Sequence, residues 1–115
     1  MKKIALLTTT LILSACSSFT MTEPLDPSYM GKWLGPEGTY LMISQSKGDG
    51  YNIQIKDLDG VVGYFGNAVD GKIEFSRNGH PATIRKGTGA ETGMKWLADK
   101  KDCLIVRDNE GYCRD

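Results

Sequence analysis

Turn signals recur about every ten residues in the second half of the chain, and this spacing constrains the fold more than any other feature. All 14 glycines lie at or after Gly31. Asp-Gly and Asn-Gly pairs favour tight hairpin turns, because both central residues of a type I′ turn need positive φ. The pattern therefore predicts an antiparallel meander, with turns at Lys47–Gly50, Asp59-Gly60, Asp70-Gly71, Asn78-Gly79 and Glu110-Gly111.

The segments between the turns have the alternation of strands. Tyr51, Ile53 and Ile55 share one parity, with polar residues between them, and Ile73 and Phe75 repeat this pattern. Such alternation predicts sheets with one face toward the core and one toward water. Residues 61–69 are apolar at both parities, which predicts a more enclosed strand. The expected strands cover about 31–34, 39–45, 51–57, 61–68, 72–76, 82–86, 103–107 and 111–113.

The fold class that follows is all-β: a small antiparallel meander barrel or sandwich of seven or eight strands. One short helical turn is expected near residues 91–98, although a strand from Met94 to Leu97 is also compatible with the sequence. A folded unit of under 90 residues buries only about 60–65% of the surface that its unfolded chain exposes, so its core is thin. A covalent cross-link would help to stabilise it.

The first 17 residues carry an export signal. Lys2 and Lys3 precede an apolar run, which ends in Leu13-Ser14-Ala15-Cys16. This stretch resembles the lipobox of bacterial lipoprotein precursors. The resemblance implies cleavage between Ala15 and Cys16, and a lipid anchor with palmitate on Cys16. An ordinary secretory signal cleaved near Ala15 is the alternative.

The lipobox sets the expected domain organisation and location. Residues 1–15 would be the signal peptide, residues 16–28 the lipidated cysteine with a flexible tether, and residues 29–115 the β-domain. Ser17 follows the cysteine, where the family has Asp for inner-membrane retention. The resemblance therefore implies the outer membrane, with the domain facing the periplasm.

The remaining cysteines, Cys103 and Cys113, flank a candidate hairpin. An oxidising compartment favours a disulfide between them, which would hold the last strand in place. A redox-active or metal-binding pair is the alternative, but it needs closer spacing or more ligands.

Composition argues against several function classes. Removing Lys2 and Lys3 leaves 12 basic against 14 acidic residues, so the chain lacks the basic surface that nucleic acid requires. His80 is the single histidine and precedes a proline next to a turn. No nucleophile-and-base pattern accompanies it. We therefore expect no catalysis, no metal site and no cofactor.

A glycine-rich segment, Gly87–Gly93, is the best candidate for contact with a partner. It is expected either to form a mobile loop or to bind an anion through its backbone amides. The candidate contact residues are Arg85, Lys86, Thr88, Glu91, Thr92 and Lys95.

Two further resemblances concern the β-domain. Gly31-Lys32-Trp33 resembles the Gly-x-Trp start of lipocalins and other calycins, which implies a barrel with the tryptophan plugging one end. Five other aromatic residues are expected in the core: Tyr40, Tyr64, Phe65, Phe75 and Trp96.

The size, the lipid anchor and the C-terminal disulfide are similar to those of small periplasmic lysozyme-inhibitor lipoproteins, which are eight-stranded barrels. Their inhibitory loop carries a Ser-Gly signature. Thr92-Gly93-Met94-Lys95 is the nearest match and lacks the serine, so no inhibitory residue is carried over.

The leading functional hypothesis is a lipid-anchored envelope protein. Its β-domain would bind another macromolecule in the periplasm, and an inhibitor-like role is one form of this hypothesis. The alternatives are a small-molecule carrier of calycin type and a purely structural envelope lipoprotein. The expected partners are the membrane, through the lipid on Cys16, and an unidentified envelope protein or other macromolecule.

Overall fold

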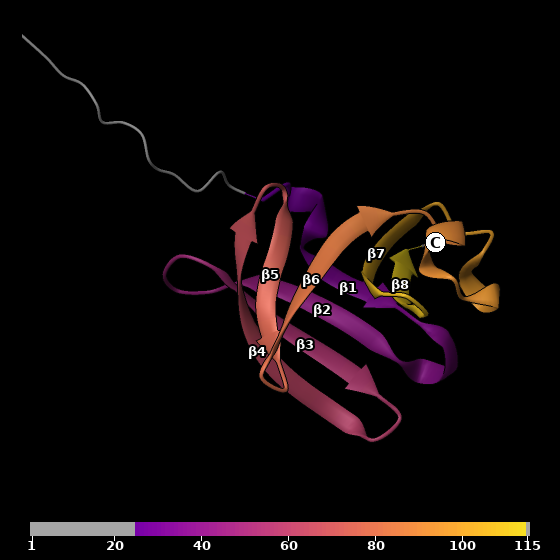
Figure 1. The fold of residues 1–115 in the computed structure, drawn as a ribbon, viewed down its shortest axis with the longest axis horizontal. Helices are drawn as coiled ribbons and strands as arrows, with labels where there is room; N and C mark the ends of the chain where they lie inside the picture. The colour runs from indigo at the N-terminus through magenta and orange to yellow at the C-terminus, as the bar shows by residue number, and fades with distance from the viewer. Residues whose placement is uncertain (1–24, 115) are drawn as a thin grey trace, which may run out of the picture.

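The computed structural model describes residues 25–114, which form eight antiparallel strands closed into a barrel (Figure 1). Each strand pairs with its neighbours in chain order, and β1 closes on β8. The prediction of a small all-β barrel is confirmed, and every expected strand end lies within two residues of the observed one. The strands are β1 (Gly31–Leu34), β2 (Tyr40–Gln45), β3 (Tyr51–Asp57), β4 (Gly60–Val69), β5 (Lys72–Arg77), β6 (His80–Gly87), β7 (Asp102–Arg107) and β8 (Glu110–Arg114).

The two turns at Asp70-Gly71 and Asn78-Gly79 have the positive φ values that their sequences predict. Asp70 and Gly71 have φ of 54° and 78°, and Asn78 and Gly79 have φ of 53° and 80°. These left-handed pairs match the right-handed twist of the flanking strands. The prediction that the last turn lies at Glu110-Gly111 is wrong, because both residues belong to β8.

The last hairpin instead turns just before Glu110, where Asn109 has φ of 67°. Gly111 is buried, and a Cβ there would lie 2.4 Å from a methyl carbon of Thr92. Its glycine is thus required by close packing and not by a turn.

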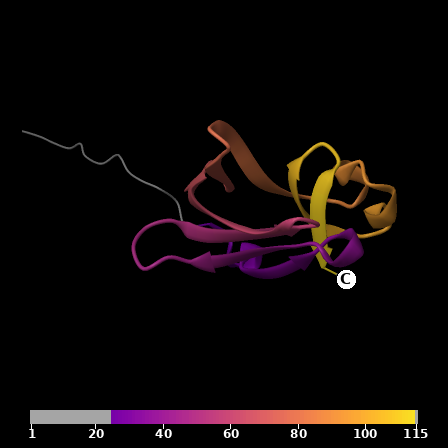
Figure 2. The same ribbon diagram turned by 90° about the horizontal axis from the view of Figure 1, so that it is seen from below.

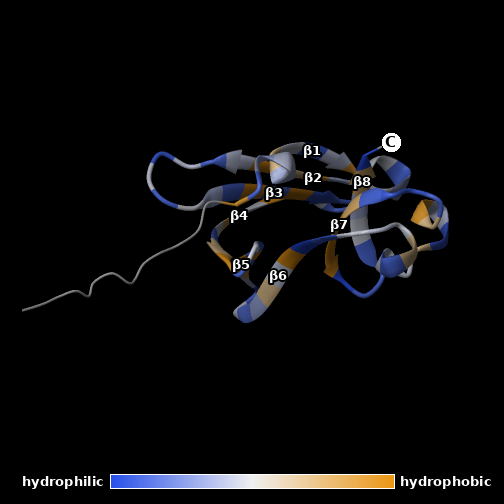
Figure 3. Ribbon diagram, turned by 90° about the horizontal axis from the view of Figure 1, so that it is seen from above, coloured by the Kyte–Doolittle hydropathy of each residue, from blue (hydrophilic) through white to orange (hydrophobic). Residues whose placement is uncertain are grey.

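The barrel interior is filled by the alternating apolar residues of the strands. Figure 3 shows this alternation as apolar stretches along the strands, beside a hydrophilic turn between β2 and β3. In β3 the parity is as predicted, with Tyr51, Ile53 and Ile55 buried. The side chains that are less than 2% exposed include Trp33, Leu41, Ile43, Ile53, Ile73, Ile84 and Leu104.

The expectation that residues 61–69 form an enclosed strand is wrong. Val61, Phe65 and Val69 are 51%, 52% and 37% exposed on the outer face of β4. Their parity is opposite to that of Gly66, which is buried against Ile73. The strand is apolar at both parities although only its inner face lies against the core.

One end of the barrel is closed by the segment that leads into β1. The 3₁₀ turn η1 (Pro27–Tyr29) lies across this end, and the indole Nε1 of Trp33 donates to the Tyr29 carbonyl at 3.0 Å. The Arg114 guanidinium stacks 3.9 Å from the centre of the Trp33 ring and donates to carbonyls of Ser28 and Met30. These contacts fix the two ends of the described chain against each other.

Packing in this region begins before the expected domain start at residue 29. The side chain of Leu25 is 5% exposed, and its backbone N–H donates to the Tyr51 hydroxyl at 3.2 Å. Tyr29 is also buried, and its hydroxyl donates to the Gly71 carbonyl. The folded unit therefore includes residues assigned to the tether from sequence.

The connection between β6 and β7 covers the outer face of the last two strands (Figure 2). It contains the 3₁₀ turns η3 (Ala90–Thr92) and η4 (Lys95–Leu97), which confirms a short helical turn in this region; a further turn, η2 (Pro36–Gly38), joins β1 to β2. Leu97 and Met94 pack against the disulfide between Cys103 and Cys113.

The two cysteines are paired in register across β7 and β8, so the predicted disulfide is confirmed. A β-bulge between Ile105 and Arg107 sets this register. Leu104 and Val106 belong to the interior core, whereas Cys103 lies under the connection outside the barrel. The continuous apolar run of β7 is explained by burial on both faces.

The predicted lipobox, with Ala15 and Cys16, lies outside the described residues. Among residues 25–114, no helix has both the length and the apolar character needed to cross a membrane.

Candidate functional site

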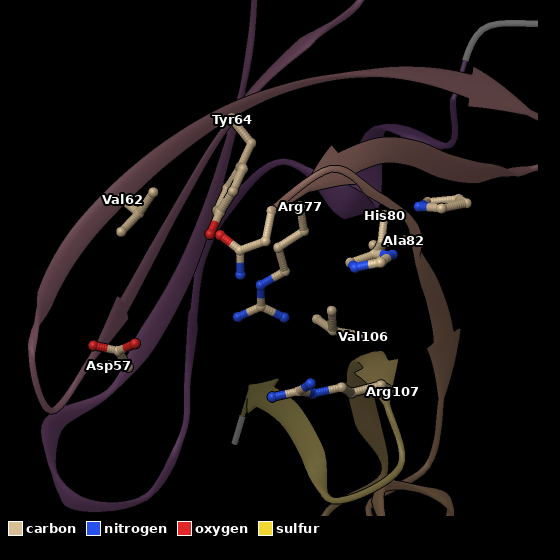
Figure 4. A pocket seen from close by; sticks show the side chains of 10 residues that line it. Asp57, Val62, Tyr64, Arg77, His80, Ala82, Val106 and Arg107 are labelled. Atoms are coloured by element: carbon tan, nitrogen blue, oxygen red, sulfur yellow. The ribbon is translucent and has the colours of Figure 1, made fainter.

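The barrel is open at the end opposite η1. β6 and β7 pair only from Arg85 to Gly87, and the first half of β6 pairs with β5 alone. Toward the turn between β5 and β6 the two strands diverge and leave a cavity of about 560 Å³ (Figure 4). The cavity thus results from incomplete pairing between two neighbouring strands.

The walls of this cavity are of two kinds. An apolar part is made by Val62 and Tyr64 of β4, by Pro81 and Ala82 of β6, and by Val106 of β7. A polar part is made by Asp57, Arg77, Asn78, His80 and Arg107. The ring of Tyr64 packs against Phe75 at 5.2 Å between ring centres, which joins the apolar wall to the barrel core.

Glu110 organises the charged side chains at this end. Arg77 donates to both Glu110 carboxylate oxygens, at 2.7 and 3.0 Å, in a bidentate ion pair. Arg107 Nε donates to the same carboxylate at 3.0 Å, and the Tyr112 hydroxyl donates at 2.7 Å. The side chains of Arg77 and Glu110 are only 16% and 14% exposed, so this pair is largely shielded from water.

The ionisation of the cluster follows from these contacts. Burial opposes the charge on Glu110, but the hydrogen bonds from Arg77 and Tyr112 and the nearby guanidinium charges outweigh it and lower its pKa. The hydrogen bond to Glu110 raises the pKa of Arg77 above its ordinary value. Burial, followed by donation to the carboxylate, raises the pKa of Tyr112. The cluster is therefore a carboxylate, two guanidinium cations and a neutral phenol at neutral pH.

Asp57 and His80 are the other ionisable groups of the cavity wall. One carboxylate oxygen of Asp57 accepts from the backbone N–H groups of Asp59 and Gly60 at 2.8 and 3.1 Å, within its own turn. His80 is exposed at the rim. Within residues 25–114 its imidazole forms no hydrogen bond with a carboxylate. Both side chains lie where a bound molecule could contact them.

The residues proposed from sequence for partner contact do not form one surface. Arg85 and Glu91 are exposed and lie 3.8 Å apart in an ion pair. Lys86 instead packs over Tyr29 at the closed end of the barrel. Thr92 is fully buried, and its hydroxyl donates to the Gly89 carbonyl at 2.6 Å.

The backbone amides of Thr88 and Gly89 in the glycine-rich segment are already bonded within the protein. Thr88 N–H donates to the Glu91 carboxylate, and Gly89 N–H donates to the Lys100 carbonyl. A Cβ at Gly89 would lie 1.6 Å from the Leu97 carbonyl oxygen, so the segment packs tightly at this point. These contacts leave neither amide free for an anion.

The expectation that Trp96 and Phe65 lie in the core is wrong. Trp96 is 78% exposed, whereas its neighbour Leu97 is 5% exposed and packs on the disulfide. η4 turns the chain so that Leu97 points inward and the indole points outward. Phe75 is buried as expected, and Tyr40 and Tyr64 are half-buried.

Sequence reasoning missed the Arg77–Glu110 pair and the cavity beside it. The partners are 33 residues apart, and no local pattern joins them. One signal was present: Arg77 has the same parity in β5 as the buried Ile73 and Phe75, which places a cation on the inner face.

Within residues 25–114, no group of three or more His, Cys, Asp or Glu side chains could hold a metal ion. No family model, curated protein or solved structure matches this chain.

Proposed function

We propose that this protein is a lipid-anchored envelope protein whose barrel binds a small amphipathic molecule at its open end. The cavity of about 560 Å³ between β4, β6 and β7 carries this proposal. Its volume lies in the range of sites for small molecules, roughly 300–1,000 Å³. Such sites combine apolar walls with placed polar groups. Here five apolar residues and five polar residues line the cavity.

The arrangement of the polar groups supports binding. Arg77 is held by two hydrogen bonds to Glu110, which is itself held by Tyr112. Side chains fixed in this way lose little conformational freedom when a ligand arrives. The opposite end of the barrel is filled by Trp33 and η1, so a ligand would enter from the open end alone.

Replacing Ala82 with tryptophan is expected to fill the cavity and to weaken binding of the neutral fluorescent probe 1-aminoanthracene by at least about tenfold. Ala82 lies on the inner face of β6 and lines the cavity. Fluorescence titration measures the affinity. Asn52→Trp, on the exposed outer face of β3, is the matched control and should bind as the wild type does. Unaltered affinity in the Ala82→Trp variant would contradict the proposal.

A second candidate function is contact with a larger envelope component through the β6–β7 connection. The observation that favours it is the exposed Trp96, held by a connection that is braced by Leu97 and the disulfide. Aromatic side chains on rigid supports are frequent anchors of protein interfaces. Lys95, Lys100 and Lys101 are exposed around it.

The anchor and this second function are tested together on envelope fractions. The wild type should sediment with membranes, and Cys16→Ser should move the chain to the soluble fraction.

Trp96→Ala should stay with the membranes but lose a protein that co-purifies with the wild type. Lys47→Ala, on the distant β2–β3 turn, should retain it. Sedimentation of the Cys16→Ser chain with membranes would contradict the anchor, and identical co-purification by the Trp96→Ala variant would contradict the contact.

A further inference from the structure

We infer that the molecule bound in the open end of the barrel carries a single anionic group, held by Arg107 beside Arg77, on an apolar body. This inference rests on the proposed binding of a small molecule. It concerns the chemical class of that molecule.

The first argument is the balance of charge around Glu110. Two guanidinium groups share one carboxylate, so the trio of Arg77, Arg107 and Glu110 has one surplus positive charge. Both terminal nitrogens of Arg77 donate hydrogen bonds to Glu110, whereas Arg107 donates to Glu110 only through Nε. In the described part of the chain, the two terminal nitrogens of Arg107 form no hydrogen bond. These paired donors match the geometry of a carboxylate.

The second argument is the position of the carboxylate behind the cations. Arg77 and Arg107 line the cavity, whereas Glu110 does not. Glu110 faces a smaller hollow of about 230 Å³ on the other side of the two arginines. A group entering the cavity therefore meets guanidinium nitrogens first. Arg107 is 73% exposed and Arg77 only 16%, so reduced screening by water strengthens the attraction mainly through Arg77.

Asp57 is the carboxylate that does line the cavity, and its placement fits an anion on the far side. Figure 4 shows Asp57 on one side and Arg107 on the other, with the guanidinium of Arg77 between them. One oxygen of Asp57 is already occupied by backbone donors of its turn. Asp59 and Asp108 on nearby turns are exposed, where salt screens their charge.

The third argument is the apolar part of the wall, which lies beside the cations. Val62, Ala82 and Val106 offer only hydrocarbon, and the ring of Tyr64 lies next to them with its centre 5.9 Å from the Arg77 guanidinium. A hydrocarbon body laid against this wall would remove apolar surface from water. The trio of Arg77, Arg107 and Glu110 has only one surplus positive charge, and Asp57 on the cavity wall opposes it, so the cavity does not favour a molecule with several phosphates. The cavity fits a monoanionic amphiphile.

Three probes of equal chain length test this inference: octanoate, octanol and octylammonium. The protein is the full chain with Cys16→Ser, and binding is followed by two-dimensional NMR titration at low salt. We expect octanoate to bind about tenfold more tightly than octanol, and octylammonium to bind most weakly. Arg107→Gln should remove the preference for octanoate and leave the affinity for octanol unchanged. Arg107→Lys should retain part of the preference for octanoate, because lysine keeps the positive charge but lacks the paired donors of the guanidinium group.

Arg85→Gln, which removes an exposed cation outside the cavity, is the control and should keep the preference. Equal affinity for octanoate and octanol in the wild type would overturn the inference, and so would an unchanged preference in the Arg107→Gln variant. In both cases the proposed binding of a small molecule in the barrel would still be supported. Failure of all three probes and of 1-aminoanthracene would overturn the proposed function together with the inference.

Discussion

Replacing Cys103 and Cys113 together by alanine is expected to lower the free energy of unfolding by roughly 2.5–3 kcal/mol. The disulfide closes a loop with a sequence separation of 10, and the chain-entropy model gives this value for a loop of that size. For a small domain the loss is a large share of a net stability of about 5–15 kcal/mol. The melting temperature should fall by roughly 10–20 °C.

The packing around the disulfide adds to this effect. Cys103 is fully buried and Cys113 is 3% exposed, and Leu97 of the β6–β7 connection rests on them. Alanine leaves a gap under Leu97, whereas serine would add buried hydroxyl groups. Denaturant unfolding measures the change.

The same experiment in reductant separates the covalent effect from the packing effect. Reduced wild-type protein should lose most of the stability that the double variant loses, and the double variant should not respond to reductant. A loss of under 1 kcal/mol in the double variant would show that β8 is held mainly by its other contacts. The bidentate pair from Glu110 and the Arg114 contacts would then carry this role.

Replacing Glu110 with glutamine is expected to destabilise the protein by about 2–4 kcal/mol, because it leaves the largely buried Arg77 without a counter-charge. The amide keeps the shape of the side chain but offers one acceptor oxygen in place of two. Arg77, Arg107 and Tyr112 would compete for it. Denaturant unfolding near pH 7 measures the change.

The effect of this substitution should depend on pH in one direction. The pKa of Glu110 is lower in the folded protein than its ordinary value of 4.5. Its ionised form therefore contributes stability that is fully present above the unfolded pKa and is lost as pH falls through the folded pKa. The stability difference between the wild type and the glutamine variant should accordingly shrink in acid.

Glu74→Gln is the matched control, since Glu74 is exposed on the outer face of β5. It should change stability by less than about 0.5 kcal/mol at either pH. If the Glu110→Gln variant were as stable as the wild type near pH 7, the cost of burying the charged cluster would cancel the attraction between its charges, as happens for some buried ion pairs.

The features that were predictable from sequence are those coded by short stretches. Asn78-Gly79 specifies its own turn, and the alternation of Tyr51, Ile53 and Ile55 specifies which face of β3 is inward. Cys103 and Cys113 were close enough in sequence for a hairpin to bring them together. Local chemistry and period-2 patterning sufficed for these elements.

The features that were missed depend on what covers a strand or on residues far apart in the chain. Both β4 and β7 have apolar residues at successive positions, yet β4 exposes Phe65 while β7 is buried on both faces. The difference lies in the path of the β6–β7 connection, which also turns Trp96 outward. The open cavity depends on where β6 stops pairing with β7, and no single residue marks that point.

The two ends of the barrel differ, because one end is closed and the other is open. Leu25 packs beside Tyr51 at one end of β3, and Asp57 at the other end of β3 lines the cavity mouth. The seven residues of β3 separate these points by about 20 Å. The start of the described chain and the cavity mouth therefore lie at opposite ends of the barrel. Under the proposed binding of a small molecule, a ligand would enter at the end of the barrel farther from the point where the chain enters the fold.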